Sequence, residues 1–233
     1  MFFPVTCVDD FYDDVDNVRD FALSLKYSKN FNDNFPGERT ECLSTIDKTF
    51  FDYFCTKLFS LFFDLNQTEI NWELNTHFQK TYQYDSPEKY FLDVNSGWCH
   101  LDIRCILGGV IYLNQNPNPD AGTIICKLNN NNYKPFENTE WVSARNNFYN
   151  KKSNDIEKYV NVKRNHHKNF DTTLEFKNEY NRMICYDSDY WHRESQFSMP
   201  DEDFRLTQVF FITEMQCKNP TLPPYLRSKK YVI

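Results

Sequence analysis

Apolar residues recur at helical spacing in the first quarter of the chain. Residues 15–25 place them three and four positions apart, which is the spacing of one helix face. Asp13 or Asp14, just before this segment, can cap the helix by accepting backbone N–H bonds. Residues 44–63 predict a second helix. Its aromatic side chains spread around the whole circumference, which indicates burial on more than one face.

The spacing changes from helical to alternating after residue 66. In residues 72–78 apolar and polar side chains alternate, as they do in a half-buried strand. Two helices followed by many short strands favour an α+β fold, with an all-β core and N-terminal flanking helices, over an alternating βαβ arrangement. Further strands are predicted from apolar runs at residues 105–113, 123–128, 174–176, 182–186 and 204–213.

Two segments between the predicted strands lack clear periodicity. Residues 85–97 are predicted to form a loop. Residues 129–172 carry asparagine clusters and a polar stretch with a predicted helix at 153–159, and we expect an insertion or a lid there. We interpret His166 and His167 as part of a solvated loop, because no carboxylate or cysteine lies at ligand spacing from them.

Composition and charge narrow the class of protein. With 233 residues and 40% hydrophobic side chains, the chain can bury the core of one domain. The net charge of −7, without a long basic run, argues against nucleic acid as the main partner. No apolar run approaches a membrane span, and acidic residues soon follow the apolar residues 1–5, so we expect neither a transmembrane helix nor a signal peptide. The eight cysteines form no CxxC pair, and we expect reduced thiols in a cytoplasmic protein.

The strongest candidate chemistry lies at His100-Leu101-Asp102. On a strand, side chains two positions apart point to the same face, so an imidazole and a carboxylate would lie side by side. His192, which follows a predicted strand and a turn, is the best candidate for a third ligand. Two histidines and one carboxylate form the ligand set of non-haem Fe(II) oxygenases, which leaves three positions open for cosubstrate and O2. The other interpretation is that His100 and His192 are ordinary polar residues at strand ends, because an HxD pair is common by chance.

Three further residues bear on this choice. Arg205 lies in an otherwise apolar strand, where an unpaired guanidinium is costly to bury, and its planar fork suits a bound carboxylate. Thr207 shares its strand face and can donate a hydroxyl. Tyr112 is an even number of residues from His100, so the two side chains share a face if the strand between them is unbroken. The open alternatives are an internal salt bridge for Arg205 and a core position for Tyr112.

In order and spacing, these pieces resemble a known family, the Fe(II)/2-oxoglutarate-dependent oxygenases. The likeness is greatest to the prolyl-4-hydroxylase-like branch and to its small free-standing bacterial and phage members. Two departures are that the arginine lies further from the distal histidine than in many prolyl hydroxylases, and that the 121–123 turn lacks a double glycine. The matching segments are residues 97–102, 109–114, 121–123, 181–192 and 205–207, and more weakly 35–40.

The resemblance implies a double-stranded β-helix, or jelly roll, and a set of roles. His100, Asp102 and His192 would ligate Fe(II). Arg205, helped by Tyr112 and Thr207, would hold the distal carboxylate of the cosubstrate 2-oxoglutarate. The implied reaction uses O2 to convert 2-oxoglutarate to succinate and CO2 and, through a ferryl intermediate, to hydroxylate a substrate C–H bond.

We expect one oxygenase domain over residues 1–233. Residues 1–66 would give helical support, residues 67–213 the core, and residues 214–233 a tail along the surface. The substrate stays open between a peptidyl residue such as proline and a small molecule, and the sequence does not indicate the oligomeric state. Two alternatives are a non-catalytic binding protein on the same fold and a zinc-dependent hydrolase, in which Arg205 and Tyr112 would have no obvious task.

Other chemistry-bearing side chains have simpler interpretations. We expect His77 to be a hydrogen-bonded strand residue, and Cys99 to be a core residue, because neighbours on a strand point to opposite faces. Trp98 and Trp191 flank the two candidate ligand histidines. They either form the walls of a substrate entrance or simply pack in the core.

Overall fold

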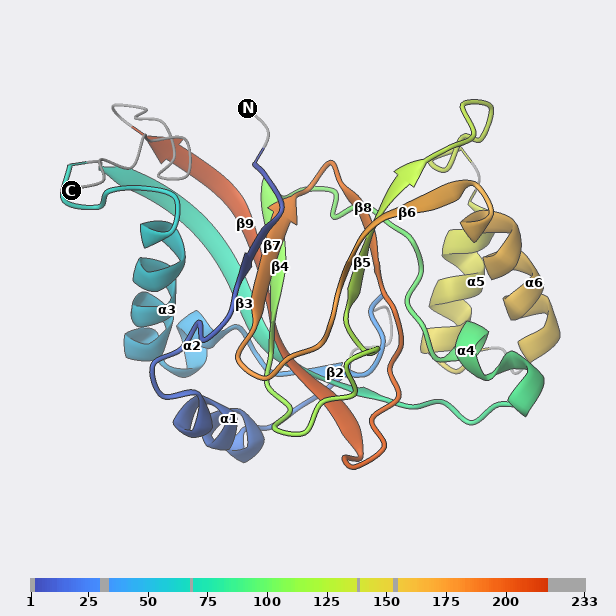
Figure 1. Cartoon of the computed structure of the whole chain (residues 1–233), viewed down its shortest axis with the longest axis horizontal. Coiled ribbons are helices and arrows are strands. Elements are labelled where there is room, and N and C mark those ends of the chain that lie inside the picture. Colours follow the sequence, from blue (N-terminus) through green and yellow to red (C-terminus); the bar gives the residue numbers. More distant parts are fainter. Residues whose placement is uncertain (1–2, 30–33, 68, 138, 153–154, 218–233) are drawn as a thin grey trace, which may run out of the picture.

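Two antiparallel sheets form the centre of the molecule (Figure 1). The computed structural model describes residues 3–29, 34–67, 69–137, 139–152 and 155–217. An apolar cluster that includes Tyr112, Ile125 and Tyr186 lies between the two sheets. The larger sheet has the order β1 (Thr6–Val8), β7 (Met183–Asp187), β4 (Leu107–Tyr112), β9 (Phe204–Cys217), β3 (Ile70–Tyr82) and β2 (Glu38–Arg39). The smaller sheet has the order β6 (Phe170–Phe176), β5 (Thr123–Leu128) and β8 (Trp191–Glu194).

The N-terminal helices pack on the larger sheet, on the side away from the smaller one (Figure 1). They are α1 (Val15–Ser24), α2 (Leu43–Ile46) and α3 (Lys48–Ser60). The cap of α1 is Asp14, whose side chain accepts the Asn17 N–H. The second predicted helix is divided at Asp47, because the backbone of Asp47 is extended and its side chain caps α3 instead. The prediction of one continuous helix over 44–63 was therefore wrong, but helices do occupy most of that segment.

The predicted strands are present, and the two longest extend beyond the predicted bounds. β3 and β9 pair along their whole lengths, from Ile70 opposite Cys217 to Tyr82 opposite Phe204. His77 is hydrogen-bonded within this region, through its Nδ1 atom and the Thr40 carbonyl, as we expected. The result is an α+β protein with antiparallel sheets and N-terminal helices outside them.

The chain between His100 and β4 is not a continuous strand. Residues 101–106 form a turn, and Arg104 has a positive φ of 81°. Such a backbone conformation cannot continue a strand. The assumption of an unbroken strand from His100 to Tyr112 was therefore wrong, and with it the argument from even spacing.

Residues 129–172 contain more structure than predicted. They form α5 (Glu140–Tyr149) and α6 (Ile156–His167) before β6 begins. We refer to α5 and α6, residues 140–167, as the helical insert. The predicted helix at 153–159 corresponds to the beginning of α6, with residues 153 and 154 outside the described residues; α5 was not predicted. The predicted 85–97 loop contains a 3-10 turn (Glu88–Tyr90) and the short helix α4 (Phe91–Val94), which packs against the insert (Figure 1).

The thiols agree with the expectation of a reduced protein, since all eight cysteines are free. Cys99 and Cys185 are buried core residues, whereas Cys105 is partly exposed. Among the described helices, none has the length and the apolar composition that a membrane crossing requires. The predicted tail over residues 214–233 was wrong for residues 214–217, which continue β9 and pair with β3. The rest of the predicted tail, residues 218–233, lies outside the described part of the chain.

Candidate metal centre and cofactor pocket

His100 and His192 lie side by side on two neighbouring chain segments. Their backbones exchange two hydrogen bonds, with N–O distances of 2.9 and 3.0 Å, and form an isolated antiparallel bridge. The Gly97 N–H donates to the Glu194 carbonyl at 2.9 Å, so residues 97–100 run along the edge of β8. The two imidazole ring centroids are 4.4 Å apart. This backbone pairing fixes both rings on one side of the smaller sheet.

The Asp102 carboxylate completes a group of three ligand-type side chains. Its Oδ1 atom is 3.6 Å from His100 Nε2, and its Oδ2 atom is 3.3 Å from His192 Nε2. The three ligand atoms all lie within 4.8 Å of one another. Gly108 leaves room for the carboxylate, because a Cβ atom there would be 2.9 Å from Asp102 Oδ2. The structure thus brings together the three predicted residues, and we call this group the metal cluster.

Backbone carbonyls hold both histidines of the metal cluster in one tautomer. His100 Nδ1–H donates to the Trp98 carbonyl at 2.7 Å, and His192 Nδ1–H donates to the Tyr190 carbonyl at 2.9 Å. Because a carbonyl can only accept, the proton must be on Nδ1 in each ring. The Nε2 lone pair of each neutral ring therefore faces Asp102, as in metal-binding histidines oriented by a carbonyl.

The charges within the metal cluster stabilise one another. Burial alone would raise the pKa of Asp102, but the neighbouring His192 and His100 rings outweigh it and hold that pKa well below its usual range. Burial would lower the pKa of His192, yet the adjacent Asp102 carboxylate raises it. A divalent cation would replace the histidine protons as the partner of this carboxylate, and the two nitrogen atoms and one oxygen suit Fe(II).

Arg205 lies on β9 and lines the same cavity as the metal cluster, a space of about 450 Å³. The residue is only 2% exposed, and its Nε–H donates to the Ala121 carbonyl at 2.8 Å. Among the described residues, no carboxylate lies within ion-pair distance of its guanidinium. The structure therefore does not contain the internal salt bridge that was the alternative for Arg205.

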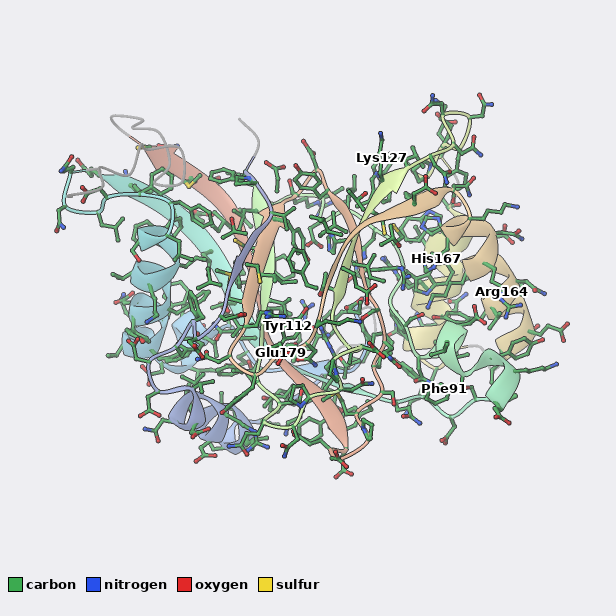
Figure 2. The ribbon with its side chains drawn as sticks, viewed as in Figure 1. Phe91, Tyr112, Lys127, Arg164, His167 and Glu179 are labelled. Atoms are coloured by element: carbon green, nitrogen blue, oxygen red, sulfur yellow. The ribbon has the colours of Figure 1, made fainter. Side chains whose placement is uncertain are left out.

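Tyr112 and Thr207 both lie close to Arg205. The Arg205 guanidinium carbon is 5.2 Å from the Tyr112 ring centroid, and the Tyr112 hydroxyl donates to Thr123 Oγ1 at 2.8 Å. Tyr112 thus lies beside Arg205, as predicted, although no continuous strand connects it to His100. Figure 2 shows Tyr112 between the two sheets. The Thr207 hydroxyl is buried and has no hydrogen-bond partner among the described residues, a state that costs about 1–3 kcal/mol. A ligand that accepts this hydrogen bond would remove that cost.

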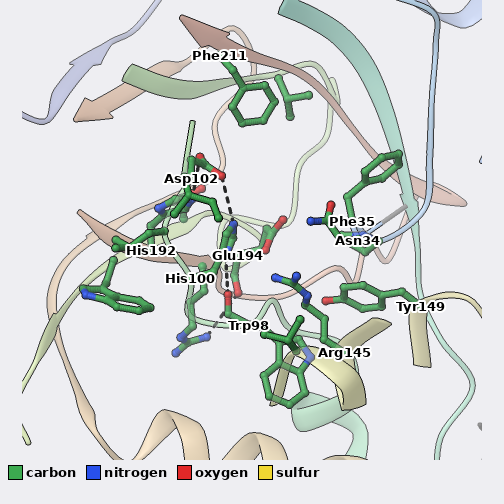
Figure 3. A pocket seen from close by; sticks show the side chains of 18 of the residues that line it. Asn34, Phe35, Trp98, His100, Asp102, Arg145, Tyr149, His192, Glu194 and Phe211 are labelled. Atoms are coloured by element: carbon green, nitrogen blue, oxygen red, sulfur yellow. Dashed lines mark hydrogen bonds and ion pairs between the residues drawn. The ribbon is translucent and has the colours of Figure 1, made fainter. Parts of the chain in front are cut away.

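Sequence analysis missed several charged residues of the cavity, and two of them, Glu194 and Arg145, face one another. Glu194 lies two positions after His192 on β8, so the rule that paired His100 with Asp102 could have found it. Arg145 comes from α5 of the helical insert, where no hydrophobic periodicity gives a signal. Figure 3 shows Arg145 and Glu194 pointing toward one another across the cavity, with Tyr149 beside the arginine.

His166 and His167 are not in a solvated loop, and that interpretation was wrong. His166 is 2% exposed; its Nε2–H donates to the Cys99 carbonyl at 2.7 Å, and its Nδ1 accepts from the Tyr133 hydroxyl at 2.6 Å. His167 Nε2 accepts the Cys99 N–H at 3.0 Å. The end of α6 therefore holds both backbone groups of Cys99, the residue next to His100, while Arg164 of the same helix lies on its outer side (Figure 2).

The two tryptophans that flank the metal cluster differ in their surroundings. Trp98 is 1% exposed, packs against Trp141 and donates its Nε1–H to the Tyr159 hydroxyl at 2.8 Å. Trp191 is partly exposed, and its ring lies tilted against Phe170, with the ring centroids 4.8 Å apart. Both also line the cavity, so each tryptophan packs and forms a wall at the same time.

Comparisons with solved structures support the fold. HygX from Streptomyces hygroscopicus, crystallised with nickel and 2-oxoglutarate, has a TM-score of 0.51 at 11% identity, over 89% of this chain and 82% of HygX. This likeness shows that the two chains share a fold. Prolyl 4-hydroxylases from Phytophthora capsici and Pseudomonas putida match with TM-scores of 0.44 and 0.42, at 13% and 12% identity, over 89% of this chain in both cases and 58% and 91% of theirs.

The sequence itself has fewer matches. No curated protein matches it. The sequence model of the family of unknown function DUF6445 matches residues 3–211, which is most of the chain, and the protein belongs to this family.

Proposed function

We propose that this protein is an Fe(II)- and 2-oxoglutarate-dependent dioxygenase that hydroxylates a C–H bond of its substrate. One observation carries the proposal: the metal cluster and the buried Arg205, which has no carboxylate partner among the described residues, line the same cavity. A zinc-dependent hydrolase would have no use for the buried Arg205. A site that binds a keto acid next to a metal uses both the metal cluster and Arg205. We also propose that the two sheets form a jelly roll, and that the chain is a single oxygenase domain with the cavity between its sheets.

His100, Asp102 and His192 would hold the ferrous ion. Their three ligand atoms occupy one side of the site, so the other side stays open for cosubstrate and O2. The hydrogen bonds from Nδ1 to the Trp98 and Tyr190 carbonyls keep each Nε2 lone pair available, and therefore maintain the ligand geometry. When bound, iron and 2-oxoglutarate would supply O2 activation coupled to the release of succinate and CO2.

Arg205 would bind the distal carboxylate of 2-oxoglutarate through its planar fork. Its Nε–H is already used by the Ala121 carbonyl, which fixes the plane of the guanidinium. The Thr207 hydroxyl, which has no partner in the free protein, would donate to the same carboxylate. Tyr112 would keep the guanidinium in place by lying against it, with its own hydroxyl bonded to Thr123.

The test is an anaerobic titration of metal-free protein with Fe(II) and then 2-oxoglutarate, followed by visible absorption. Chelation of ferrous iron by a keto acid gives a weak charge-transfer band, and we expect this band in the wild type. In Arg205→Gln the iron should still bind, but the affinity for 2-oxoglutarate should fall about thirtyfold or more, because a buried charge pair is lost. The matched control is Arg164→Gln, which removes a largely exposed arginine from an ion pair with Asp93.

Three results would contradict the proposal. If folded wild-type protein binds Fe(II) but forms no band, the cavity does not chelate a keto acid. If the band forms but no substrate ever increases O2-dependent succinate formation, the non-catalytic binding protein becomes the better interpretation. Zinc bound in preference to iron after anaerobic purification, together with hydrolytic activity, would favour the hydrolase.

A further inference from the structure

The described side chains that line the cavity carry more positive than negative charges, whereas the net charge of the whole chain is negative. The chain carries a net charge of −7. Among the described residues, the cavity is lined by four arginines but only two carboxylates. A cavity that collects positive charge in an acidic protein concentrates anions. The arginines are Arg39, Arg145, Arg193 and Arg205, and the carboxylates are Asp102 and Glu194.

The proposed cofactors do not balance this charge. Ferrous iron adds two positive charges and 2-oxoglutarate two negative ones, so the pair is neutral as a whole. Arg205 is assigned to 2-oxoglutarate and Asp102 to the metal, so neither cofactor neutralises Arg145. The remaining ligand of the cavity, the substrate, is therefore expected to bring negative charge.

Arg145 is the arginine best placed to receive this charge. It extends from α5 into the cavity and lies across the cavity from the metal cluster (Figure 3). Its Nε–H donates to Asn146 Oδ1 at 3.2 Å, and its guanidinium carbon is 5.1 Å from the Trp141 ring centroid. Among the described residues, no carboxylate lies within ion-pair distance of it. This half-buried guanidinium is held in place on one side, and on its other side it faces Glu194 without forming an ion pair.

The neighbouring Glu194 limits which anion fits. Its carboxylate lies against the backbone of residue 97, where a Cβ atom would be 1.9 Å from Glu194 Oε2, and Figure 3 shows it facing Arg145. A dianion such as a phosphate monoester would be repelled by this carboxylate. A single carboxylate can take the guanidinium fork in a bidentate pair and leave Glu194 on its far side.

The size and the walls of the cavity indicate a small molecule. A volume of about 450 Å³ falls in the range of about 300–1,000 Å³ that small-molecule sites occupy. Aromatic rings from the insert and the smaller sheet line it, among them Trp141, Tyr149 and Trp191. The structure offers an apolar wall for the body of the substrate and one guanidinium for its acidic group.

We propose, on the basis of the proposed function, that the substrate is a small carboxylic acid and that Arg145 binds its carboxylate. Arg205 and Arg145 then divide the two acids of the reaction between them, the cosubstrate on β9 and the substrate on α5. Because Arg145 belongs to the helical insert, the insert would determine which substrate is accepted, and the strands would supply the metal and the cosubstrate site.

The test compares matched pairs of probes that differ only in charge. The pairs are carboxylic acids and their primary amides, from propanoate to phenylpropanoate and the N-acetyl amino acids. Binding is followed by quenching of tryptophan fluorescence, since Trp98, Trp141 and Trp191 line the cavity. It is measured both in metal-free protein and in protein loaded anaerobically with Fe(II) and 2-oxoglutarate. Stimulation of succinate formation is measured in parallel.

We expect at least one acid to bind the wild type about thirtyfold more tightly than its amide. This preference should disappear in Arg145→Gln, be reduced in Arg145→Lys, which keeps the charge but loses the fork, and persist in the control Arg164→Gln. The affinity of Arg145→Gln for 2-oxoglutarate, read from the charge-transfer band, should equal that of the wild type. Arg145→Lys keeps the test valid if the glutamine variant does not fold.

The outcomes separate this inference from the proposed function. No preference for an acid in any pair, including no binding by any acid, overturns the inference. A loss of 2-oxoglutarate affinity in Arg145→Gln also overturns it, because Arg145 would then belong to the cosubstrate site. Absence of the charge-transfer band in the wild type overturns the proposed function alone, and the preference of metal-free protein for acids still decides the role of Arg145.

Discussion

The metal cluster and the helical insert meet at the same cavity, but they are built in different ways. The cluster takes its three side chains from short extended segments, and a single backbone bridge between His100 and His192 aligns them. The insert is a pair of helices whose inner side carries polar groups as well as aromatic rings. Lys163, only 1% exposed, donates to the carbonyls of Asp93 and Ser96 at 2.7 and 2.5 Å and to Ser96 Oγ at 3.0 Å.

The insert therefore supports the segment that leads to His100. Lys163 binds that segment at Ser96, and His166 and His167 bind it at Cys99. The sequence led us to expect an insertion or a lid, and these buried hydrogen bonds favour a fixed support over a mobile cover. The strands thus carry the candidate reactive residues. The insert holds the 93–99 segment in place and adds Arg145 to the cavity.

The largest effect is expected from breaking the metal cluster itself. Asp102→Ala removes the only carboxylate among the three ligand side chains. Metal affinity should fall more than about a hundredfold, because changes to the surrounding hydrogen-bond partners alone cost 10–100-fold. The measurement is a competition for Fe(II) or Co(II) with a chelator under anaerobic conditions. Far-UV circular dichroism should show that both helices of the insert remain.

Asp120→Ala is the matched control, because Asp120 is an exposed carboxylate paired with Lys177 on the surface. Its metal affinity should equal that of the wild type. If Asp102→Ala binds the metal as tightly as this control does, the three side chains are not a metal site. The strands would then not carry a metal site, and the contrast between reactive strands and supporting insert would be wrong.

The parts that the sequence predicted are those governed by short-range rules. Period-2 and period-3.6 patterns located the strands and the N-terminal helices, and the i, i+2 rule placed His100 beside Asp102. Local pattern also suggested His192, after a predicted strand and turn, and Arg205, in an apolar strand, and the family resemblance then assigned their roles. The assumed unbroken strand to Tyr112 was wrong because a turn around Arg104 interrupts it, and turns with positive φ at non-glycine residues carry little sequence signal.

The helical insert was only partly predicted, for a different physical reason. Besides aromatic rings, its inner side carries residues that normally face water, such as Lys163 and His166, and a hydrophobic pattern assigns them to the surface. They are buried because backbone carbonyls and amides of the 93–99 segment satisfy them, and that pairing is visible only in three dimensions. Hence the role of Arg145, which depends on the insert, also escaped the sequence.

The second prediction uses pH to distinguish the insert from the rest of the molecule. Burial lowers the pKa of His166 to about 4, and the charges of Arg145 and Lys163 act in the same direction. His166 is then neutral in the folded protein, whereas the unfolded chain binds a proton below about pH 6.5. The unfolded state therefore gains a proton first, and His166 alone should lower the free energy of unfolding by about 1.4 kcal/mol per pH unit between pH 6.5 and 4.

Urea unfolding of metal-free protein at pH 6.5, 5.5 and 4.5 measures this slope. His167 has a lowered pKa for the same reason and adds to the slope in the same direction. In His166→Gln the amide can still donate to the Cys99 carbonyl but cannot be protonated, so the slope should be smaller by about 1.4 kcal/mol per pH unit. An unchanged slope in this variant would mean that His166 is already accessible to protons in the folded protein.

The smallest effect concerns two threonines on neighbouring strands of the larger sheet. Thr207 has a buried hydroxyl with no partner in the part of the chain that the structure describes. Thr76 Oγ1, in contrast, donates to the Val209 carbonyl and accepts from Gln208 Nε2, both at 3.0 Å. Thr207→Val should raise the free energy of unfolding of the cofactor-free protein by about 1 kcal/mol, because it removes an unsatisfied buried group. It should also weaken 2-oxoglutarate binding about tenfold, because the ligand loses a donor.

Thr76→Val is the control and should do the reverse: it should lower the free energy of unfolding by about 1–3 kcal/mol and leave 2-oxoglutarate binding unchanged. If both valine variants destabilise the protein equally, the Thr207 hydroxyl already has a partner in solution and is not reserved for the cosubstrate.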